Sequence, residues 1–269
     1  MDRQGETKMG ETLKQRLKNH ETVFGTFYKL NSPIATEMLG WAGMDFIVID
    51  CEHGAISSES VENIVRCADS TGMSTVVRVA SDAEEHILHA LDSGAEGVQI
   101  PDLKTVEQFK RSAAACKYYP LGTRGLSRGT RSSRFGFWNE AEQPYVEAAN
   151  ERSLVVVHIE NKEMAEKIDE ICQIPDIDVV FVGPADMSQS LGIPGKSKDP
   201  RVVEVACKVL EAAEKYGKAG GINVTNPQDL EMYMQHGARY IMYSSDTGIF
   251  AKALKSTVAQ FAPYKSEKK

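Results

Sequence analysis

The chain has 269 residues, of which 42% are hydrophobic and 26% are charged, and its formal net charge is −7. This charge excludes the basic balance expected of a nucleic-acid-binding protein. No apolar stretch approaches the roughly 20 residues of a membrane span, and residues 1–8 contain no apolar signal region. The five cysteines have no CxxC spacing, which indicates reduced thiols. We therefore expect a cytoplasmic protein that binds neither nucleic acid nor membrane.

Eight apolar runs rich in Val and Ile occur along the chain and alternate with amphipathic segments. Continuous apolar runs are typical of parallel strands that are buried on both faces. The predicted strands are Val23–Lys29, Asp45–Asp50, Thr75–Val79, Gly97–Pro101, Leu154–Glu160, Val179–Val182, Ala219–Val224 and Tyr240–Tyr243.

The intervening segments carry helix signals. Ser32 before Pro33 and Asn226 before Pro227 both place an N-cap residue ahead of a proline. The predicted helices are Pro33–Trp41, Ser58–Ser70, Ala83–Asp92, Thr105–Tyr118, Glu163–Cys172, Pro200–Tyr216, Pro227–Gln235 and Thr247–Phe261. This alternation predicts an α/β fold, either a parallel barrel or a doubly wound sheet.

Eight units of this length favour a single-domain (β/α)8 TIM barrel. We place the barrel at residues 11–262, after a flexible N-terminus at 1–10 and before a charged tail at 263–269.

One connection, residues 122–138, is longer than the others and is expected to lack regular structure. It carries Arg124, Arg128, Arg131 and Arg134 at regular spacing. Two interpretations remain open: a lid that attracts anionic substrates, or a loop that is solvated or contacts another subunit.

Polar residues at the carboxyl ends of the predicted strands define the candidate site, because a TIM barrel forms its active site there. They are Asp50, Glu52, His53, Arg78, Gln99, His158, Glu160, Asp186, Ser188 and Asn223. Glu160 and Asp186 are hard oxygen ligands suited to a divalent cation, although each could instead cap a helix N-terminus. We favour a metal site, because the two lie at adjacent strand ends.

The remaining polar residues suggest a catalytic base and an anion partner. His53 titrates near neutrality and is the candidate general base. Arg78 needs an anionic partner, which is either a substrate carboxylate or a barrel carboxylate such as Asp50. His158 points to the same face as Glu160 and is either a third metal ligand or a group that orients one. Cys51 is interpreted as a small apolar filler.

Several motifs resemble those of the HpcH/HpaI aldolase family, the class II pyruvate-dependent aldolases. The resemblance runs from about Leu13 to Phe261. It depends on Phe46-Ile-Val-Ile-Asp-Cys-Glu-His53, Arg78, Leu91-Asp-Ser-Gly-Ala95, Ile100-Pro101, Tyr119-Pro-Leu-Gly-Thr-Arg-Gly125, Glu160 and Val182-Gly-Pro-Ala-Asp-Met-Ser-Gln-Ser-Leu-Gly192.

The resemblance implies roles for individual residues. Glu160 and Asp186 would hold a divalent metal, Mg²⁺ or Mn²⁺ in the first place, with Co²⁺, Ni²⁺ and Zn²⁺ as alternatives. Arg78 would bind the pyruvyl carboxylate and keto oxygen. His53 would be the base, polarised by Asp92 or helped by Asp50. The amides near Ala185 and Asp186 would receive the substrate carboxylate. A homo-oligomer is also implied, a hexamer in which a C-terminal helix packs on a neighbouring barrel.

Three positions depart from the family pattern. His158 stands where relatives commonly have Gln, Cys51 where a small residue such as Gly is common, and Asn223 where some have an apolar residue. We expect Asn223 to contact the aldehyde part of the substrate.

The expected activity is reversible, metal-dependent aldol cleavage of a 4-hydroxy-2-oxo acid to pyruvate and an aldehyde. A Schiff-base mechanism would need a desolvated lysine, and Lys29 and Lys162 are the candidates near strand ends. An acyl-CoA lyase of the same superfamily is a second candidate activity. A non-catalytic barrel that binds an oxo acid is the candidate that involves no enzyme.

Overall fold

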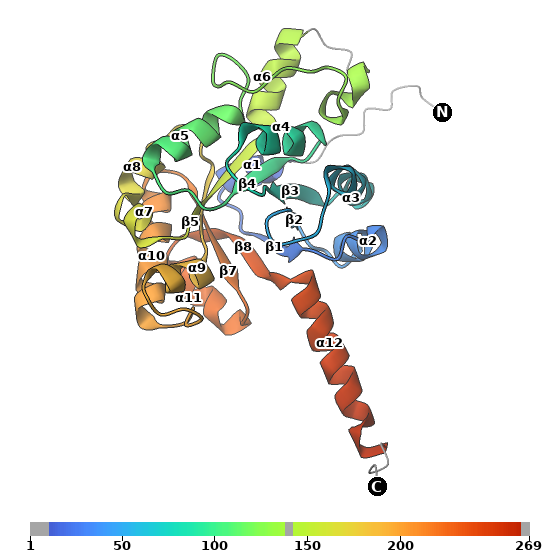
Figure 1. Ribbon diagram of the computed structural model, residues 1–269, viewed down its shortest axis with the longest axis vertical. Helices are drawn as coiled ribbons and strands as arrows, with labels where there is room; N and C mark the ends of the chain where they lie inside the picture. The colour runs from blue at the N-terminus through green and yellow to red at the C-terminus, as the bar shows by residue number, and fades with distance from the viewer. Residues whose placement is uncertain (1–10, 138–141, 265–269) are drawn as a thin grey trace.

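Eight parallel strands form a closed barrel in the computed structural model of the protein, which describes residues 11–137 and 142–264 (Figure 1). The last strand pairs with the first and closes the sheet. The strands are β1 (Val23–Tyr28), β2 (Phe46–Asp50), β3 (Ser74–Arg78), β4 (Gly97–Ile100), β5 (Leu154–Ile159), β6 (Val179–Val182), β7 (Ala219–Val224) and β8 (Ala238–Ser245). The predicted (β/α)8 barrel is confirmed.

The predicted strands agree with these bounds to within two residues at each end, and β6 and β7 match them. The helices that follow the strands lie outside the barrel (Figure 1). They include α2 (Pro33–Trp41), α3 (Ser58–Thr71), α4 (Glu84–Asp92), α5 (Val106–Ala115), α7 (Lys162–Glu166), α8 (Ile168–Cys172), α10 (Pro200–Lys215), α11 (Leu230–Gln235) and α12 (Asp246–Phe261).

Two predicted helices have a different form in the structure. The segment Glu163–Cys172 is divided at Lys167 into α7 and α8, and Pro227–Gln235 begins as the 3-10 turn η2 (Pro227–Asp229). Three further helices are not predicted from the sequence, because each is short or lies beside the irregular connection. They are α1 (Leu13–Lys18), α6 (Glu142–Arg152) and α9 (Pro184–Ser190).

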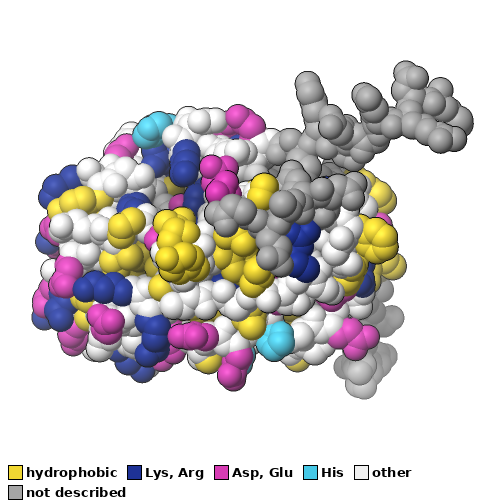
Figure 2. Space-filling view, turned by 90° about the horizontal axis from the view of Figure 1, so that it is seen from above, with side chains coloured by type: hydrophobic (Ala, Val, Ile, Leu, Met, Phe, Trp, Pro, Cys, Tyr) yellow, Lys and Arg dark blue, Asp and Glu magenta, His cyan; other side chains and the backbone are white. Residues whose placement is uncertain are grey.

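The connection at 122–138 is not structureless in its described part. It contains the 3-10 segment η1 (Arg131–Gly136), and α6 follows it. Trp138 lies outside the described residues, as do the predicted flexible segment 1–10 and most of the predicted tail at 263–269. Figure 2 views the molecule from above, and this face mixes charged side chains of both signs with hydrophobic ones.

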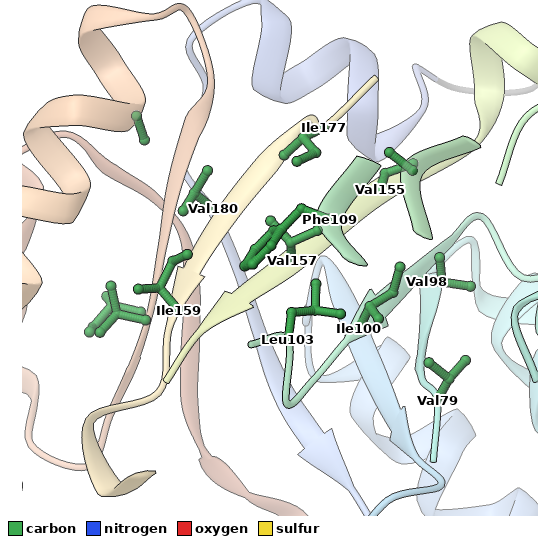
Figure 3. Close-up of a cluster of buried hydrophobic side chains, with 14 of the residues drawn as sticks. Val79, Val98, Ile100, Leu103, Phe109, Val155, Val157, Ile159, Ile177 and Val180 are labelled. Carbon is green, nitrogen blue, oxygen red and sulfur yellow. The ribbon is translucent and has the colours of Figure 1, made fainter. Parts of the chain in front are cut away.

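The core has two layers, because successive side chains of a strand point to opposite faces. The outer layer lies between strands and helices, and Figure 3 shows Val98, Ile100, Val155 and Val157 in it together with Phe109 of α5. The inner layer fills the barrel. Its buried members include Phe27, Phe46, Val48, Val76, Val156, Phe181, Tyr240 and Met242. Leu13 and Leu17 of α1 belong to this inner cluster, so α1 covers one end of the barrel.

Helix α12 extends away from the barrel (Figure 1). Its large apolar side chains Phe250, Leu254, Val258 and Phe261 are all exposed. None of the helices in residues 11–137 and 142–264 is long and apolar enough to cross a membrane.

Candidate active site

A buried ion pair joins the carboxyl ends of β2 and β3. Asp50 has no exposed surface, and both its oxygens accept hydrogen bonds from Arg78, Oδ1 from Nε at 2.9 Å and Oδ2 from Nη2 at 2.6 Å. The two residues are also direct neighbours in the register of the sheet. The guanidinium lies over the ring of Phe27, with Cζ 4.4 Å from the ring centroid. Of the partners expected for Arg78, the structure therefore shows the barrel carboxylate.

The same carboxylate organises the turn that follows β2. Oδ1 of Asp50 accepts the backbone N–H groups of Glu52 and His53 at 3.2 and 3.1 Å. The amine of Lys29 lies 3.1 Å from Oδ2. Burial by itself would raise the pKa of Asp50, but Arg78, the His53 amide and Lys29 lower it to about 2. Asp50 is therefore a fixed anion that positions its neighbours.

His53 lines a cavity at this end of the barrel, and Glu52 precedes it in the turn after β2. The His53 side chain is 59% exposed, and its Nε2 atom lies 3.7 Å from Oε2 of Glu52. Oε2 of Glu52 also lies 3.0 Å from Nη1 of Arg78. Burial raises the pKa of Glu52, Arg78 opposes that shift, and Glu160 adds to it. His53 is therefore accessible to a ligand and close to a carboxylate, as a general base would need to be.

Glu160 follows β5 and is ionised in the folded protein. Its Oε1 lies 2.5 Å from Nδ1 of His158, and its Oε2 accepts the backbone N–H of Asp102 at 2.9 Å. Burial would raise the pKa of Glu160, but His158 and the Asp102 amide lower it to about 2. A Cβ at Gly183 would lie 3.0 Å from Cγ of Glu160, so glycine permits the start of α9 to approach this carboxylate.

Asp186 lies in the first turn of α9, where a carboxylate is favourable. Burial raises the pKa of Asp186, and the negative charge of Glu160 raises it further. Both carboxylates line the same cavity. The structure thus brings the two predicted metal ligands together in a repulsive pair that a cation would stabilise. The described residues contain no group of three or more His, Cys, Asp or Glu side chains arranged for a metal.

The cavity at this end of the barrel has a volume of about 450 Å³. Ala185 lines it at the N-terminus of α9, where the first backbone N–H groups of a helix have no intrahelical acceptor. Asn223 of β7 also lines it, and its Oδ1 atom is buried without a hydrogen-bond partner. Two of the three positions that depart from the family pattern, Asn223 and His158, therefore face the cavity. The third, Cys51, packs against the core, and burial raises the pKa of its thiol to about 11.

The expectation that Asp92 polarises His53 does not fit the arrangement within one chain. Asp92 is the last residue of α4, which runs back from β3, so it lies toward the opposite end of the barrel. Its Oδ1 accepts a hydrogen bond from Nη2 of Arg124 at 2.7 Å. Neither residue lines the cavity that contains His53.

The lid interpretation of the arginine-rich connection also finds no support within the chain. Arg124 is buried beside Asp92, and Arg131 pairs with Asp69 of α3 at 2.6 Å. The guanidinium of Arg128 lies over the ring of Tyr145. These arginines face α3, α4 and α6 rather than the cavity, because the connection packs along the outside of the barrel.

Several residues that line the cavity are not predicted from the sequence. Phe27 and Phe181 are ordinary barrel-filling side chains by type. Lys198 and Asp229 both line the cavity and pair at 2.8 Å, but they lie in polar stretches beyond the strands. A search limited to strand ends could have found Phe27 and Phe181, but it would have missed Lys198 and Asp229.

Fold and site together define a barrel enzyme with paired carboxylates at the carboxyl ends of its strands, and comparison with known proteins places it further. Residues 23–253 match the family described as HpcH/HpaI aldolase/citrate lyase. The chain is 30% identical to the 5-keto-4-deoxy-D-glucarate aldolase of Klebsiella pneumoniae over 249 residues, which cover 93% of this chain and 96% of that protein. It is also 30% identical to the hydroxypyruvate/pyruvate aldolase of Roseobacter denitrificans over 251 residues, with 93% and 96% covered.

Among solved structures, the HpcH/HpaI aldolase of Desulfitobacterium hafniense superposes with a TM-score of 0.87 at 28% identity, covering 94% of this chain and 97% of that one. The chain belongs to the HpcH/HpaI aldolase/citrate lyase family. It is an enzyme, a carbon–carbon lyase.

The Asp50–Arg78 pair predicts how stability depends on pH. The pKa of Asp50 is about 2 in the folded protein and 3.8 in its ordinary state. The lowered pKa contributes stability above about pH 4, and this contribution is lost as the pH falls toward 2. It amounts to roughly 2–3 kcal/mol, from about 1.4 kcal/mol per pKa unit. Urea denaturation of the wild type and of Asp50→Asn from pH 6 to pH 2.5 measures it.

The difference in unfolding free energy between the two proteins should shrink across this window. Asp69→Asn provides the control, because Asp69 also pairs with an arginine but is half exposed. Its difference from the wild type should stay small at every pH. A pH-independent difference for Asp50→Asn would contradict the assignment.

Proposed function

We propose that the protein catalyses the reversible, divalent-metal-dependent aldol cleavage of a 4-hydroxy-2-oxo acid to pyruvate and an aldehyde. The observation that carries this proposal is that Glu160 and Asp186 line one cavity together with Arg78, whose guanidinium is held by Asp50. The name of the Roseobacter denitrificans relative, a hydroxypyruvate/pyruvate aldolase, supports pyruvate as one of the products.

The donor set fits a hard divalent cation. Glu160 and Asp186 are carboxylates, which suit Mg²⁺ or Mn²⁺ and can also bind Co²⁺, Ni²⁺ or Zn²⁺. Two protein ligands leave coordination positions free for substrate oxygens and water. When bound, the ion would neutralise the charge that develops on the 2-oxo oxygen during cleavage.

Residues of the chain bind the pyruvyl end of the substrate. The free N–H groups at the start of α9, at Ala185 and Asp186, would receive the carboxylate. Arg78 donates Nε and one N–H of Nη2 to Asp50, so it cannot bind a substrate carboxylate through that same bidentate edge. Its Nη1 also lies 3.0 Å from Oε2 of Glu52, which leaves one N–H each on Nη1 and Nη2. It would use its remaining N–H groups for the 2-oxo oxygen and stabilise the enolate formed there.

His53 would act as the general base. It would take the proton of the C4 hydroxyl, after which the C3–C4 bond breaks, the aldehyde leaves and the electron pair forms the enolate of pyruvate. The enolate carbon then takes a proton to give pyruvate. Asp50 would hold the turn that carries His53 rather than transfer a proton itself.

The aldehyde would lie along the polar wall formed by Asn223 and the Lys198–Asp229 pair. Asn223 offers an unpartnered Oδ1 atom, which can accept a hydrogen bond from a substrate hydroxyl. Lys198 is paired with Asp229, so this wall presents little net charge. A hydroxylated aldehyde fits it better than a carboxylate does.

The Schiff-base alternative finds no support among its two lysines. Lys29 pairs with Asp50 at 3.1 Å, and Lys162 is 58% exposed. Neither is a desolvated amine of the kind that such a mechanism needs.

Chelation should abolish pyruvate release, and Mg²⁺ or Mn²⁺ should restore it. Asp186→Asn should lower kcat/KM by more than about 100-fold, the loss of several kcal/mol of transition-state stabilisation. Glu163→Gln provides a control, because Glu163 is an exposed carboxylate three residues from Glu160. The assay is pyruvate release from a panel of 4-hydroxy-2-oxo acids. Full activity of the metal-free protein would rule out the metal-dependent mechanism.

His53→Ala should lower kcat by about 10²–10⁴-fold, the usual contribution of general acid–base catalysis. The affinity for Mn²⁺, measured by titration of the free-ion signal in electron paramagnetic resonance, should change little. His86→Ala provides the matched control, because His86 bonds Ser81 and does not line the cavity. Unchanged kcat with lost Mn²⁺ binding would make His53 a ligand instead of a base.

We also propose that the protein is a homo-oligomer, with a hexamer expected from the family likeness. Phe250, Leu254, Val258 and Phe261 recur on one side of α12 and are exposed in a single chain. Sedimentation velocity should show that Phe250→Glu with Leu254→Glu lowers the mass of the assembly. Lys252→Glu with Lys255→Glu, on the same helix, should not. Dissociation by neither pair would contradict this role of α12.

A further inference from the structure

Three polar side chains form a hydrogen-bonded network inside the barrel. Tyr240 of β8 donates its hydroxyl to Oε1 of Gln99 at 3.1 Å, and Nε2 of Gln99 lies 2.5 Å from Nε2 of His158. Tyr240 and Gln99 have no exposed surface, and His158 is 1% exposed. We call these three residues the interior network. It crosses the barrel from β8 to β4 and ends at Glu160 through Nδ1 of His158.

The orientation of the Gln99 amide decides which ring nitrogen of His158 carries the proton. Because Oε1 of Gln99 accepts from Tyr240, its amide nitrogen faces His158, and an amide nitrogen can only donate. Nε2 of His158 must then accept and carry no proton. A neutral imidazole in this state holds its proton on Nδ1, where it donates to Oε1 of Glu160.

We infer that the interior network positions Glu160 for cation binding, by holding His158 as an Nδ1–H donor. The inference builds on the proposed function, in which Glu160 is a metal ligand. His158 holds Oε1, and the Asp102 amide holds Oε2. With one lone pair of each oxygen used in this way, the carboxylate has a single orientation and directs its remaining lone pairs into the cavity.

The surroundings of the network support a positioning role rather than a packing role. The rest of the inner layer is formed mainly by apolar residues such as Phe46, Val76 and Val156, which would fill the same space without polar atoms to satisfy. The ring of Phe181 stacks on His158 with centroids 4.8 Å apart, which further restricts the imidazole. Packing alone would not require a histidine whose two ring nitrogens both have a fixed hydrogen-bond partner.

The first test measures Mn²⁺ affinity by electron paramagnetic resonance in network variants. Gln99→Leu removes the donor that fixes the His158 proton, and His158→Leu removes the contact with Glu160. Each should weaken Mn²⁺ binding by about 10–100-fold, the usual effect of losing a partner of a metal ligand. Tyr240→Phe should cause a smaller loss, because the Gln99 amide then becomes free to rotate. His158→Gln retains an N–H donor and should bind within about tenfold of the wild type.

Thr26→Val controls for the loss of a buried hydrogen bond elsewhere in the barrel. Thr26 is fully buried and its hydroxyl donates to the Tyr243 carbonyl, but its recorded hydrogen bonds do not include the network and it does not line the cavity. Its melting temperature should fall while its Mn²⁺ affinity stays unchanged. Wild-type Mn²⁺ affinity in both Gln99→Leu and His158→Leu would overturn the inference.

The second test does not depend on any variant being as stable as the wild type. Long-range ¹H–¹⁵N correlations of the histidine rings in the Mg²⁺-loaded wild type, assigned against His158→Gln, report which ring nitrogen carries the proton. We expect a protonated Nδ1 and an unprotonated Nε2 at His158. A proton on Nε2 would overturn the inference.

The Mn²⁺ measurements distinguish failure of the proposed metal site from failure of the proposed positioning role. A wild-type protein that binds no Mn²⁺ would overturn the metal site and the positioning role with it. Normal Mn²⁺ binding by the wild type and by every network variant would overturn the positioning role alone.

Discussion

The buried pair of Asp50 and Arg78 is the interaction around which the site is built. Burying an ionised carboxylate is unfavourable unless other interactions offset the loss of its hydration. At Asp50, two hydrogen bonds from the Arg78 guanidinium and the nearby amine of Lys29 provide these interactions. The same anion holds the amides of the turn that carries His53. Removing Arg78 would therefore disturb the turn that carries His53, although Arg78 lies on β3 and this turn follows β2.

Glu160 and Asp186 form a second pair, but both members are carboxylates and they repel each other. Glu160 is stabilised as an anion by its neighbours, whereas burial and Glu160 both disfavour the ionised form of Asp186. The charge of Glu160 is thus compensated within the protein, whereas a bound cation of the kind we propose would compensate that of Asp186. This asymmetry is a reason to expect that chelation would affect activity far more than it affects folding.

Much of the fold and part of the site can be predicted from the sequence. Parallel strands buried on both faces leave a local signal, so all eight are found, and residues such as Glu160 and Asn223 follow because strand ends converge in a barrel. Pairing and direction are harder to predict. Whether Arg78 pairs with a substrate or with Asp50 depends on register. The family resemblance implies a site role for Asp92, but α4 places this residue toward the other end of the barrel in its own chain.

The arginine-rich connection shows why side-chain type alone is a weak guide. Arg124 and Arg131 are candidates for a lid by residue type, but they pair with Asp92 and Asp69. No local sequence pattern predicts pairs that are so far apart in the chain. The interior network also cannot be predicted from the sequence. Gln99 and His158 can be placed near the site from their strands, but their link through Tyr240 exists only across the closed barrel.

Closure of the barrel by β8 has a consequence for biosynthesis. Tyr240 lies on the last strand of the barrel to leave the ribosome, and that strand completes the sheet by pairing with β1. A nascent chain that ends before residue 238 lacks both the closing strand and the far end of the interior network. In the positioning role that we propose, the Glu160 carboxylate of such a chain is present but not yet aligned, so cation binding would follow closure of the barrel.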